Sequence, residues 1–290
     1  MKKIYFLLLS ILLINCSSES TNPLNNSSNF DTKKIKKITI LDQDIENGVI
    51  QTHEQYDLDF VYAQNNITNV IGSIGNYNEN QTYSNGILSN INISANVYGT
   101  NSFYIRNLTV NAAGKLEKTV NIDYDIYGQR HETHFEYPNP NLIIVKEILV
   151  LPNGNQVLTD QTKNIHFVNG NVQKIEYYNI SPNALFRIDK FEYDNKINPN
   201  LGNTPNRILA DPYHSYVPYI LRNYSQLSKN NVVKYTNVYV YGTQEVVNGI
   251  YNINYMYDSQ TNLPITQSYT IMDSSMPNNG FKITATYQYQ

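Results

Sequence analysis

The chain has 290 residues, a formal net charge of −3 and a charged fraction of 16%. The acidic balance argues against nucleic acid as a partner, because nucleic-acid binding needs a basic face. A single Cys excludes a disulfide framework within the chain, so the fold has to be held together by packing.

Residues 1–15 have the pattern of an export signal, with two lysines before an apolar run over residues 4–14. The run is shorter than the ~20 residues that a membrane-spanning helix needs. The sequence Leu-Ile-Asn-Cys at residues 13–16 resembles the bacterial lipobox, although Asn15 stands where Gly, Ala or Ser is usual. We therefore predict a signal peptide over residues 1–15 and a lipid on Cys16. This anchors the protein in the bacterial cell envelope as an outer-membrane lipoprotein, on the periplasmic side or at the cell surface.

The stretch after the cysteine is made mostly of Ser, Asn and Thr. It lacks the apolar side chains that offset ordering entropy, so we expect a flexible tether over residues 16–34. Residues 35–290 then form a β-rich domain, with a possible subdivision near residue 200. Removal of the signal leaves 19 basic and 24 acidic residues, a net charge of −5.

Strand signals dominate the domain. Asn-Gly, the strongest short hairpin signal, occurs six times, with Asn at positions 47, 85, 153, 169, 248 and 279. In residues 164–178 such a turn would place Phe167 opposite Val172. Residues 251–257 alternate with period 2, placing Tyr251, Ile253, Tyr255 and Tyr257 on one face. We predict an all-β fold, a curled antiparallel meander of hairpins that forms an open or partly closed sheet.

One strand offers a candidate metal site. Residues two apart on a strand share a face, which aligns Glu132, His134 and Glu136. A carboxylate–imidazole–carboxylate row could hold a divalent metal, and a solvent-facing strand gives the same pattern. The solvent-facing interpretation is the better one, and the sequence shows no nucleophile elbow or phosphate-binding glycine loop. We therefore predict no catalytic site and no cofactor.

Residues 198–231 interrupt the strand pattern with several prolines. We expect a long loop with one or two helical turns that covers a face of the sheet. Tyr213, His214, Tyr216 and Tyr219 within it are candidates for a binding patch, since Tyr gives contact area at a low entropy cost. Rings that cap the apolar face of the sheet would give the same pattern.

The chain is rich in Tyr, with 26, and in Asn, with 44. The excess fits a sugar-binding surface of rings and amides. It also fits an A- and T-rich genome, whose codons favour Asn, Ile, Tyr and Lys. Codon usage is the preferred explanation for Asn, while both explanations can hold for Tyr, which is also a good strand residue.

Strands that end in paired aromatics before a polar turn recur along the chain. Residues 191–196, Phe-Glu-Tyr-Asp-Asn-Lys, are followed by Asn198-Pro199, and residues 255–258, Tyr-Met-Tyr-Asp, by Leu263-Pro264. Together with Leu-Ser-Lys-Asn-Asn-Val at 227–232, these motifs resemble envelope lipoproteins of Bacteroidetes-type bacteria (DUF4595-like) and their YD-repeat-like sheets. The resemblance covers roughly residues 165–290. It implies a curled antiparallel sheet at the cell envelope and no established catalytic residue.

These observations predict a lipid-anchored envelope protein that is not an enzyme. The lipid on Cys16 attaches it to the membrane. The simplest prediction for its function is that of a non-catalytic binding or interaction module for a glycan or protein ligand. A structural envelope component without a small ligand is the alternative, followed by a metal-dependent hydrolase that uses the face of Glu132, His134 and Glu136. The sequence does not fix the oligomeric state.

Overall fold

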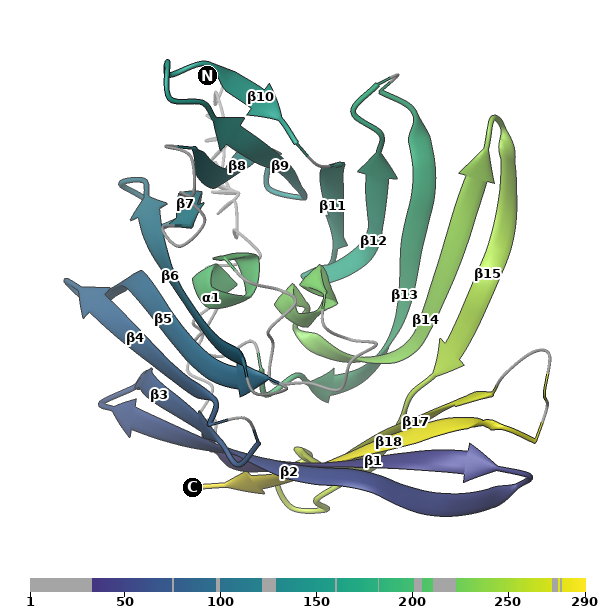
Figure 1. The fold of residues 1–290 in the computed structure, drawn as a ribbon. Helices are drawn as coiled ribbons and strands as arrows, with labels where there is room; N and C mark the ends of the chain where they lie inside the picture. Colours follow the sequence, from purple (N-terminus) through teal and green to yellow (C-terminus); the bar gives the residue numbers. More distant parts are fainter. Residues whose placement is uncertain are drawn as a thin grey trace, which may run out of the picture.

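The computed structural model describes residues 33–74, 76–97, 100–121, 129–159, 161–181, 183–200, 205–210, 223–272, 276 and 278–290. The described part is almost entirely β-structure, as predicted, with two short helical segments (Figure 1). The strands are β1 (Ile35–Glu46), β2 (Val49–Ala63), β3 (Asn66–Gly72), β4 (Asn78–Ser84), β5 (Ile87–Val97), β6 (Thr100–Val110), β7 (Leu116–Asn121), β8 (Arg130–Asn139), β9 (Leu142–Val150), β10 (Gln156–Leu158), β11 (Thr162–Val168), β12 (Asn171–Tyr178), β13 (Leu185–Ile197), β14 (Asn230–Tyr241), β15 (Gln244–Asn252), β16 (Asn254–Tyr257), β17 (Pro264–Met272) and β18 (Gly280–Tyr289). The helical segments are α1 (Pro205–Ala210) and the 3₁₀-helix η3 (Tyr224–Leu227).

The strands form one antiparallel sheet that curls nearly into a barrel (Figure 1). The meander closes on itself because β1 pairs with both β2 and β18, so that Ile40 lies between Tyr56 and Ala285. The sheet continues across residue 200, where β13 pairs with β14. This confirms the predicted curled antiparallel meander.

The barrel is incomplete beside β15. This strand pairs with β14, and β16, which follows it directly in the chain, pairs with β17. No backbone pairing joins β15 to β17 in the described part of the chain. The outer edge of β15 is therefore open, and Val246, Val247 and Ile250 are about half exposed there, at 48%, 55% and 56%.

Three of the six Asn-Gly pairs form the predicted two-residue hairpin turns. Asn47-Gly48, Asn85-Gly86 and Asn169-Gly170 all have positive φ at both residues, which Asn and Gly tolerate best. Phe167 pairs with Val172 across the last of these turns, as predicted.

The other three pairs do not form two-residue turns. Asn153-Gly154 belongs to a longer loop between β9 and β10, and Gly280 begins β18. Asn248-Gly249 lies inside β15, at a bulge opposite Asn237 and Val238, so a hairpin prediction there is wrong. The preceding Gly242, with φ of +65°, makes the turn from β14 to β15 instead.

The two helical segments lie inside the hollow of the sheet (Figure 1). Ile208 and Leu209 of α1 and Tyr224 and Leu227 of η3 belong to the same hydrophobic core as the inward side chains of the strands. Residues 198–231 thus carry short helical turns that cover the inner face, as the prolines and the break in strand pattern predicted.

An ion pair buried in this interior attaches α1 to β4. Arg207 donates to Glu79 from Nε at 2.9 Å and from Nη2 at 2.7 Å, and both side chains are at most 1% exposed. Glu79 also accepts from Tyr77 and from Gln81. From β6, Arg106 donates to the carbonyl of Ala210 at the end of α1. Charge-assisted bonds therefore hold a six-residue helix that is too short to be stable alone.

A recurring tyrosine contact explains the repeated aromatic strand ends. A tyrosine toward the end of a strand donates to the carbonyl of the first or second residue of the preceding strand. The bonds run from Tyr62 to Ile35, Tyr83 to Ile67, Tyr137 to Leu116, Tyr193 to Val172 and Tyr289 to Pro264, with O···O distances of 2.5–2.9 Å. Burial raises the pKa of Tyr83 to about 12, which keeps its hydroxyl a donor.

The aspartates of the Tyr-Asp pairs have a separate task. Asp258 accepts from the backbone N–H groups of Gln260 and Thr261, and these bonds lower the pKa of its carboxyl group. Asp194 accepts from the N–H of Lys196 in the same way. Asp258 therefore organises the turn that follows its tyrosine, whereas Asp194 bonds within the irregular end of β13.

Candidate binding surface

The predicted metal row comes together in part. Glu132 is 1% exposed in its side chain and lies 2.7 Å from Nε2 of His134, as expected for residues that share a face. The carboxylate of Glu132 also lies 2.7 Å from Nε of Arg130 and 3.4 Å from Nζ of Lys118. Glu136 is instead exposed and pairs with Lys146.

Cationic neighbours disfavour a metal at Glu132. Burial opposes its ionisation, but the hydrogen bond from His134 and the charges of Lys118 and Arg130 outweigh burial and lower the pKa of Glu132. A divalent cation would have to displace these charges. Within the described residues, no group of three or more His, Cys, Asp or Glu side chains could hold a metal ion.

A second cluster of this kind, which sequence reasoning missed, lies on β11 and β12. Glu176 contacts Nε2 of His166 at 2.8 Å and accepts from Tyr178 and Lys174. Its members come from two strands, so no local motif signals it. In both clusters a carboxylate is neutralised by its neighbours on the outer face of the sheet.

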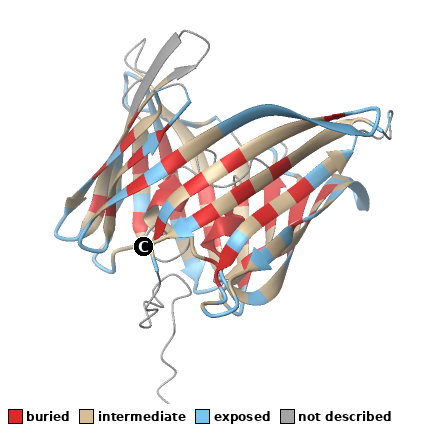
Figure 2. Cartoon of the chain, turned by 90° about the horizontal axis from the view of Figure 1, so that it is seen from below, coloured by how far each residue is buried: buried red, intermediate tan, exposed pale blue. Residues whose placement is uncertain are grey.

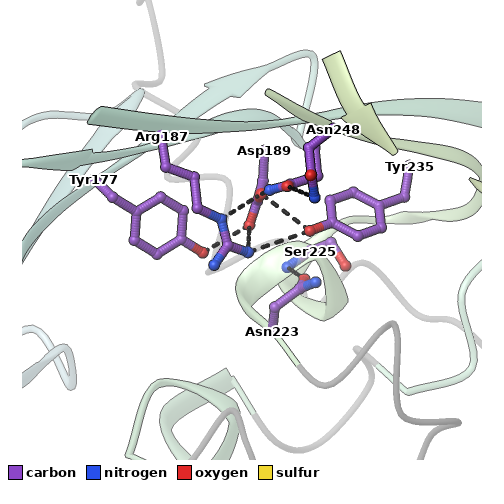
Figure 3. A network of polar contacts seen from close by, with 8 residues as sticks. Tyr177, Arg187, Asp189, Asn223, Ser225, Tyr235 and Asn248 are labelled. Atoms are coloured by element: carbon purple, nitrogen blue, oxygen red, sulfur yellow. Dashed lines mark hydrogen bonds and ion pairs between the residues drawn. The ribbon is translucent and has the colours of Figure 1, made fainter. Parts of the chain in front are cut away.

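The inner face holds a buried carboxylate with all of its acceptor positions in use (Figure 3). Asp189 accepts from Tyr177, from Nε and Nη2 of Arg187, from Tyr235 and from Asn237, at 2.8–3.0 Å. The guanidinium of Arg187 also lies 4.6 Å from the ring centroid of Tyr177. A carboxylate this fully bonded joins β12, β13 and β14 together and offers no free acceptor to a ligand.

The tyrosines of the described residues are mostly structural. Phe191, Tyr235 and Tyr251 form a stack with 5.3 Å between successive centroids, and Tyr235 is buried. The predicted patch of Tyr213, His214, Tyr216 and Tyr219 lies outside the described residues, as does Cys16. These sites stay predictions.

A small polar cavity lies between η3 and the strands around β17. Asn198, Gln226, Asn231 and Gln267 are among its lining residues, and its volume is ≈ 20 Å³. That is enough for a water molecule and too small for a sugar or a peptide side chain. The hydroxyl of Ser225, which also lines it, is buried and has no hydrogen-bond partner among the described residues.

The outer face of the sheet divides into two chemically different parts. Buried and exposed positions alternate along the strands (Figure 2), and the residues that alternate with the core point outward. From β7 to β15 ten of the outward side chains form five ion pairs, with Lys118 on Glu132, Lys146 on Glu136, Lys174 on Glu176, Lys190 on Glu245 and Lys234 on Glu192. This is the pattern of a surface that faces water.

Strands β3 to β6 instead present an uncharged array of amides. The only charged residues in 66–110 are Glu79 and Arg106, and both bond to α1 in the interior. Outward positions on these strands carry a set that we call the amide face: Asn69, Asn78, Asn80, Asn90, Asn92 and Asn107.

The amides are in register across the strands. Asn69 lies opposite Asn80, Asn80 opposite Asn92, and Asn90 opposite Asn107. Asn69 donates to Oδ1 of Asn78 at 2.7 Å and of Asn80 at 2.8 Å, and Asn90 donates to Oδ1 of Asn107 at 2.7 Å.

No protein-family model matches the chain, so its resemblance to DUF4595-like lipoproteins stays a prediction. No curated protein matches it either. No helix in the described residues is long and apolar enough to cross a membrane. Among solved structures, the chain is similar to a porin-like protein from Bacteroides uniformis ATCC 8492. The TM-score is 0.37 and the identity 10%, over 89% of this chain and 98% of that one, a likeness too low to carry a functional argument.

Proposed function

We propose that the chain is a lipid-anchored, non-catalytic binding module of the bacterial cell envelope, with the amide face as its binding surface. The lipobox-like residues before Cys16 and the polar tether over residues 16–34 support the anchor. The observation that carries the binding function is the amide face itself, an ordered and uncharged array on the outside of a sheet whose inside is packed.

The alternatives have less support from the geometry. A metal-dependent hydrolase would need acceptors around His134, where Arg130 and Lys118 instead surround its partner Glu132. A purely structural envelope component is favoured by the tyrosines that brace the strands, because these leave few rings for a ligand. This structural role does not explain why the amide face is uncharged and ordered.

The anchor is tested by fractionating cells that produce the wild-type chain or Cys16→Ser. The wild type should be in the outer-membrane fraction and Cys16→Ser should not be lipid-labelled. Protease treatment of intact and lysed cells then separates surface from periplasmic placement. A Cys16→Ser chain that still takes up labelled lipid contradicts the lipoprotein assignment.

The binding function is tested with full-length protein in liposomes, mixed with envelope fragments from cells that lack it. Wild-type liposomes should sediment with the fragments, and liposomes carrying Asn80→Val/Asn107→Val should not. Asn252→Val/Asn254→Val, the same change at exposed outward positions away from the amide face, is the matched control. Equal sedimentation of all three proteins would show that the amide face does not bind.

A further inference from the structure

The absence of charge from the amide face needs its own explanation. Codons rich in A and T favour Lys as well as Asn, yet the sequence has no Lys between Lys37 and Lys115. On other strands of the same sheet, outward positions carry Lys and Glu in pairs. Codon usage acts on the whole chain and does not select one face of four neighbouring strands. The composition is therefore a property of this surface.

The hydrogen bonds of the amide face leave donors unused. The bonds within it engage Oδ1 of Asn78, Asn80 and Asn107, so each of these oxygens already accepts one hydrogen bond. The Nδ2 groups of Asn80 and Asn107 have no partner among the described residues, and both side chains are exposed. The surface thus offers N–H donors without a positive charge.

Such a surface selects a neutral partner that is rich in acceptors. An anion would find no cation to pair with, and a cation would find no carboxylate, since Glu79 and Arg106 both point inward. Hydroxyl and ether oxygens accept hydrogen bonds from neutral amides without a charge to desolvate. Sugars carry both kinds of oxygen on every ring.

The spacing of the amides fits a polymer better than a single sugar. The row from Asn69 through Asn80 to Asn92 crosses three strands at right angles to them. Neighbouring strands lie ~4.8 Å apart, which is close to the length of one sugar ring. We infer that the amide face binds a neutral polysaccharide laid across β3 to β6, an inference that rests on the proposed binding function.

Each sugar contact on this face should be weak. Tyr77 and Tyr83, which lie on or beside β4, bond to Glu79 and to the carbonyl of Ile67 on the inner side. The described outward positions of β3 to β6 therefore offer no ring for stacking. Affinity should rise with polymer length, because a long chain engages several amides and several lipid-anchored copies at once.

The test is affinity electrophoresis of the full-length protein in detergent. Native gels are cast with dextran, mannan or laminarin as neutral polysaccharides, or with polygalacturonate as an anionic one. Wild type should be retarded at least twofold by one or more of the neutral polymers, less by its short oligosaccharides, and not by polygalacturonate. Asn80→Val/Asn107→Val should migrate as in a plain gel, and Asn252→Val/Asn254→Val should be retarded like the wild type.

Two results would overturn the inference. If no neutral polymer retards the wild type, or if the amide-face variant is retarded as much as the wild type, the ligand is not a neutral polysaccharide on this surface. The liposome assay distinguishes this failure from that of the proposed function. Sedimentation that depends on Asn80 and Asn107, without retardation by any neutral polymer, would keep the binding module and replace its ligand by a protein.

Discussion

Replacing Glu79 by Gln should remove the main attachment of α1 to the sheet. The change keeps the volume of the side chain but removes the carboxylate charge that faces the guanidinium of Arg207, which is 1% exposed. Breaking one partner of a buried ion pair costs ~3–5 kcal/mol. For a domain of this size each kcal/mol shifts Tm by ~2–4 °C, so we expect a fall of roughly 6–20 °C.

The assay is thermal and urea unfolding followed by near-UV circular dichroism, to which the 26 tyrosines contribute and no Trp interferes. Arg207→Met should destabilise by a similar amount, because Glu79 keeps its bonds from Tyr77 and Gln81 but loses the positive charge of the guanidinium. The double variant Glu79→Gln/Arg207→Met should lose less than the sum of the two single changes. Additive losses, or single variants within about 1 kcal/mol of the wild type, would refute the buried pair.

Three further changes test other parts of the fold by urea unfolding. Tyr137→Phe removes the donor to the carbonyl of Leu116 and should cost ~1–3 kcal/mol, whereas Tyr241→Phe, 65% exposed, should be neutral. The pKa of Glu132 is lower in the folded protein than its unfolded value near 4.5. Its carboxylate therefore stabilises the fold above that value, and this stabilisation is lost as the pH falls through the folded pKa. In Glu132→Gln the loss of stability between about pH 5 and about pH 3 should be smaller than in the wild type. Gly86→Ala places a Cβ at φ +77°, with no atom within 4 Å to clash, so its cost should be that of backbone strain alone, ~1–2 kcal/mol.

The local features of the fold could be predicted from the sequence because their causes are local. Asn-Gly at 47, 85 and 169 specifies positive φ at two successive residues, and that alone fixes a hairpin. Asn248-Gly249 carries the same signal, but pairing with β14 turned it into a bulge. The Tyr251 side chain, two residues along the same strand, also lies over Gly249.

Closure of the sheet had no such signal. Ile38 pairs with Leu58, which a hairpin predicts, and also with Tyr287, from the far end of the chain. Whether β1 and β18 can pair depends on the curvature of the sheet, which all the strands between them set together. Likewise, alternation placed Glu132 and His134 on one face, but Lys118 came from a neighbouring strand whose register the sequence does not encode locally.

The scarcity of charge over residues 66–110 is visible in the sequence. Its interpretation depends on which face of the sheet each side chain points to. Asn69 and Asn80 become one surface only when β3 and β4 are in register and their neighbours Val70 and Glu79 turn inward. The number of asparagines alone does not distinguish a binding surface from codon usage. The number on each face of the sheet does.

A ligand site in the packed interior and a ligand site on the amide face predict opposite effects of the same variants on binding. If a ligand entered the hollow of the sheet, loosening α1 by Glu79→Gln would open that hollow and alter binding along with stability. If recognition lies on the outer amides, Glu79→Gln at temperatures well below its Tm should leave polysaccharide retardation unchanged, because Glu79 and Asn80 project from opposite faces of β4. Asn80→Val/Asn107→Val should do the reverse, abolishing retardation while shifting Tm by little, since exposed strand positions favour Val. Loss of retardation in Glu79→Gln, with the strands still folded by far-UV circular dichroism, would place the ligand inside and remove the reason for assigning function to the amide face.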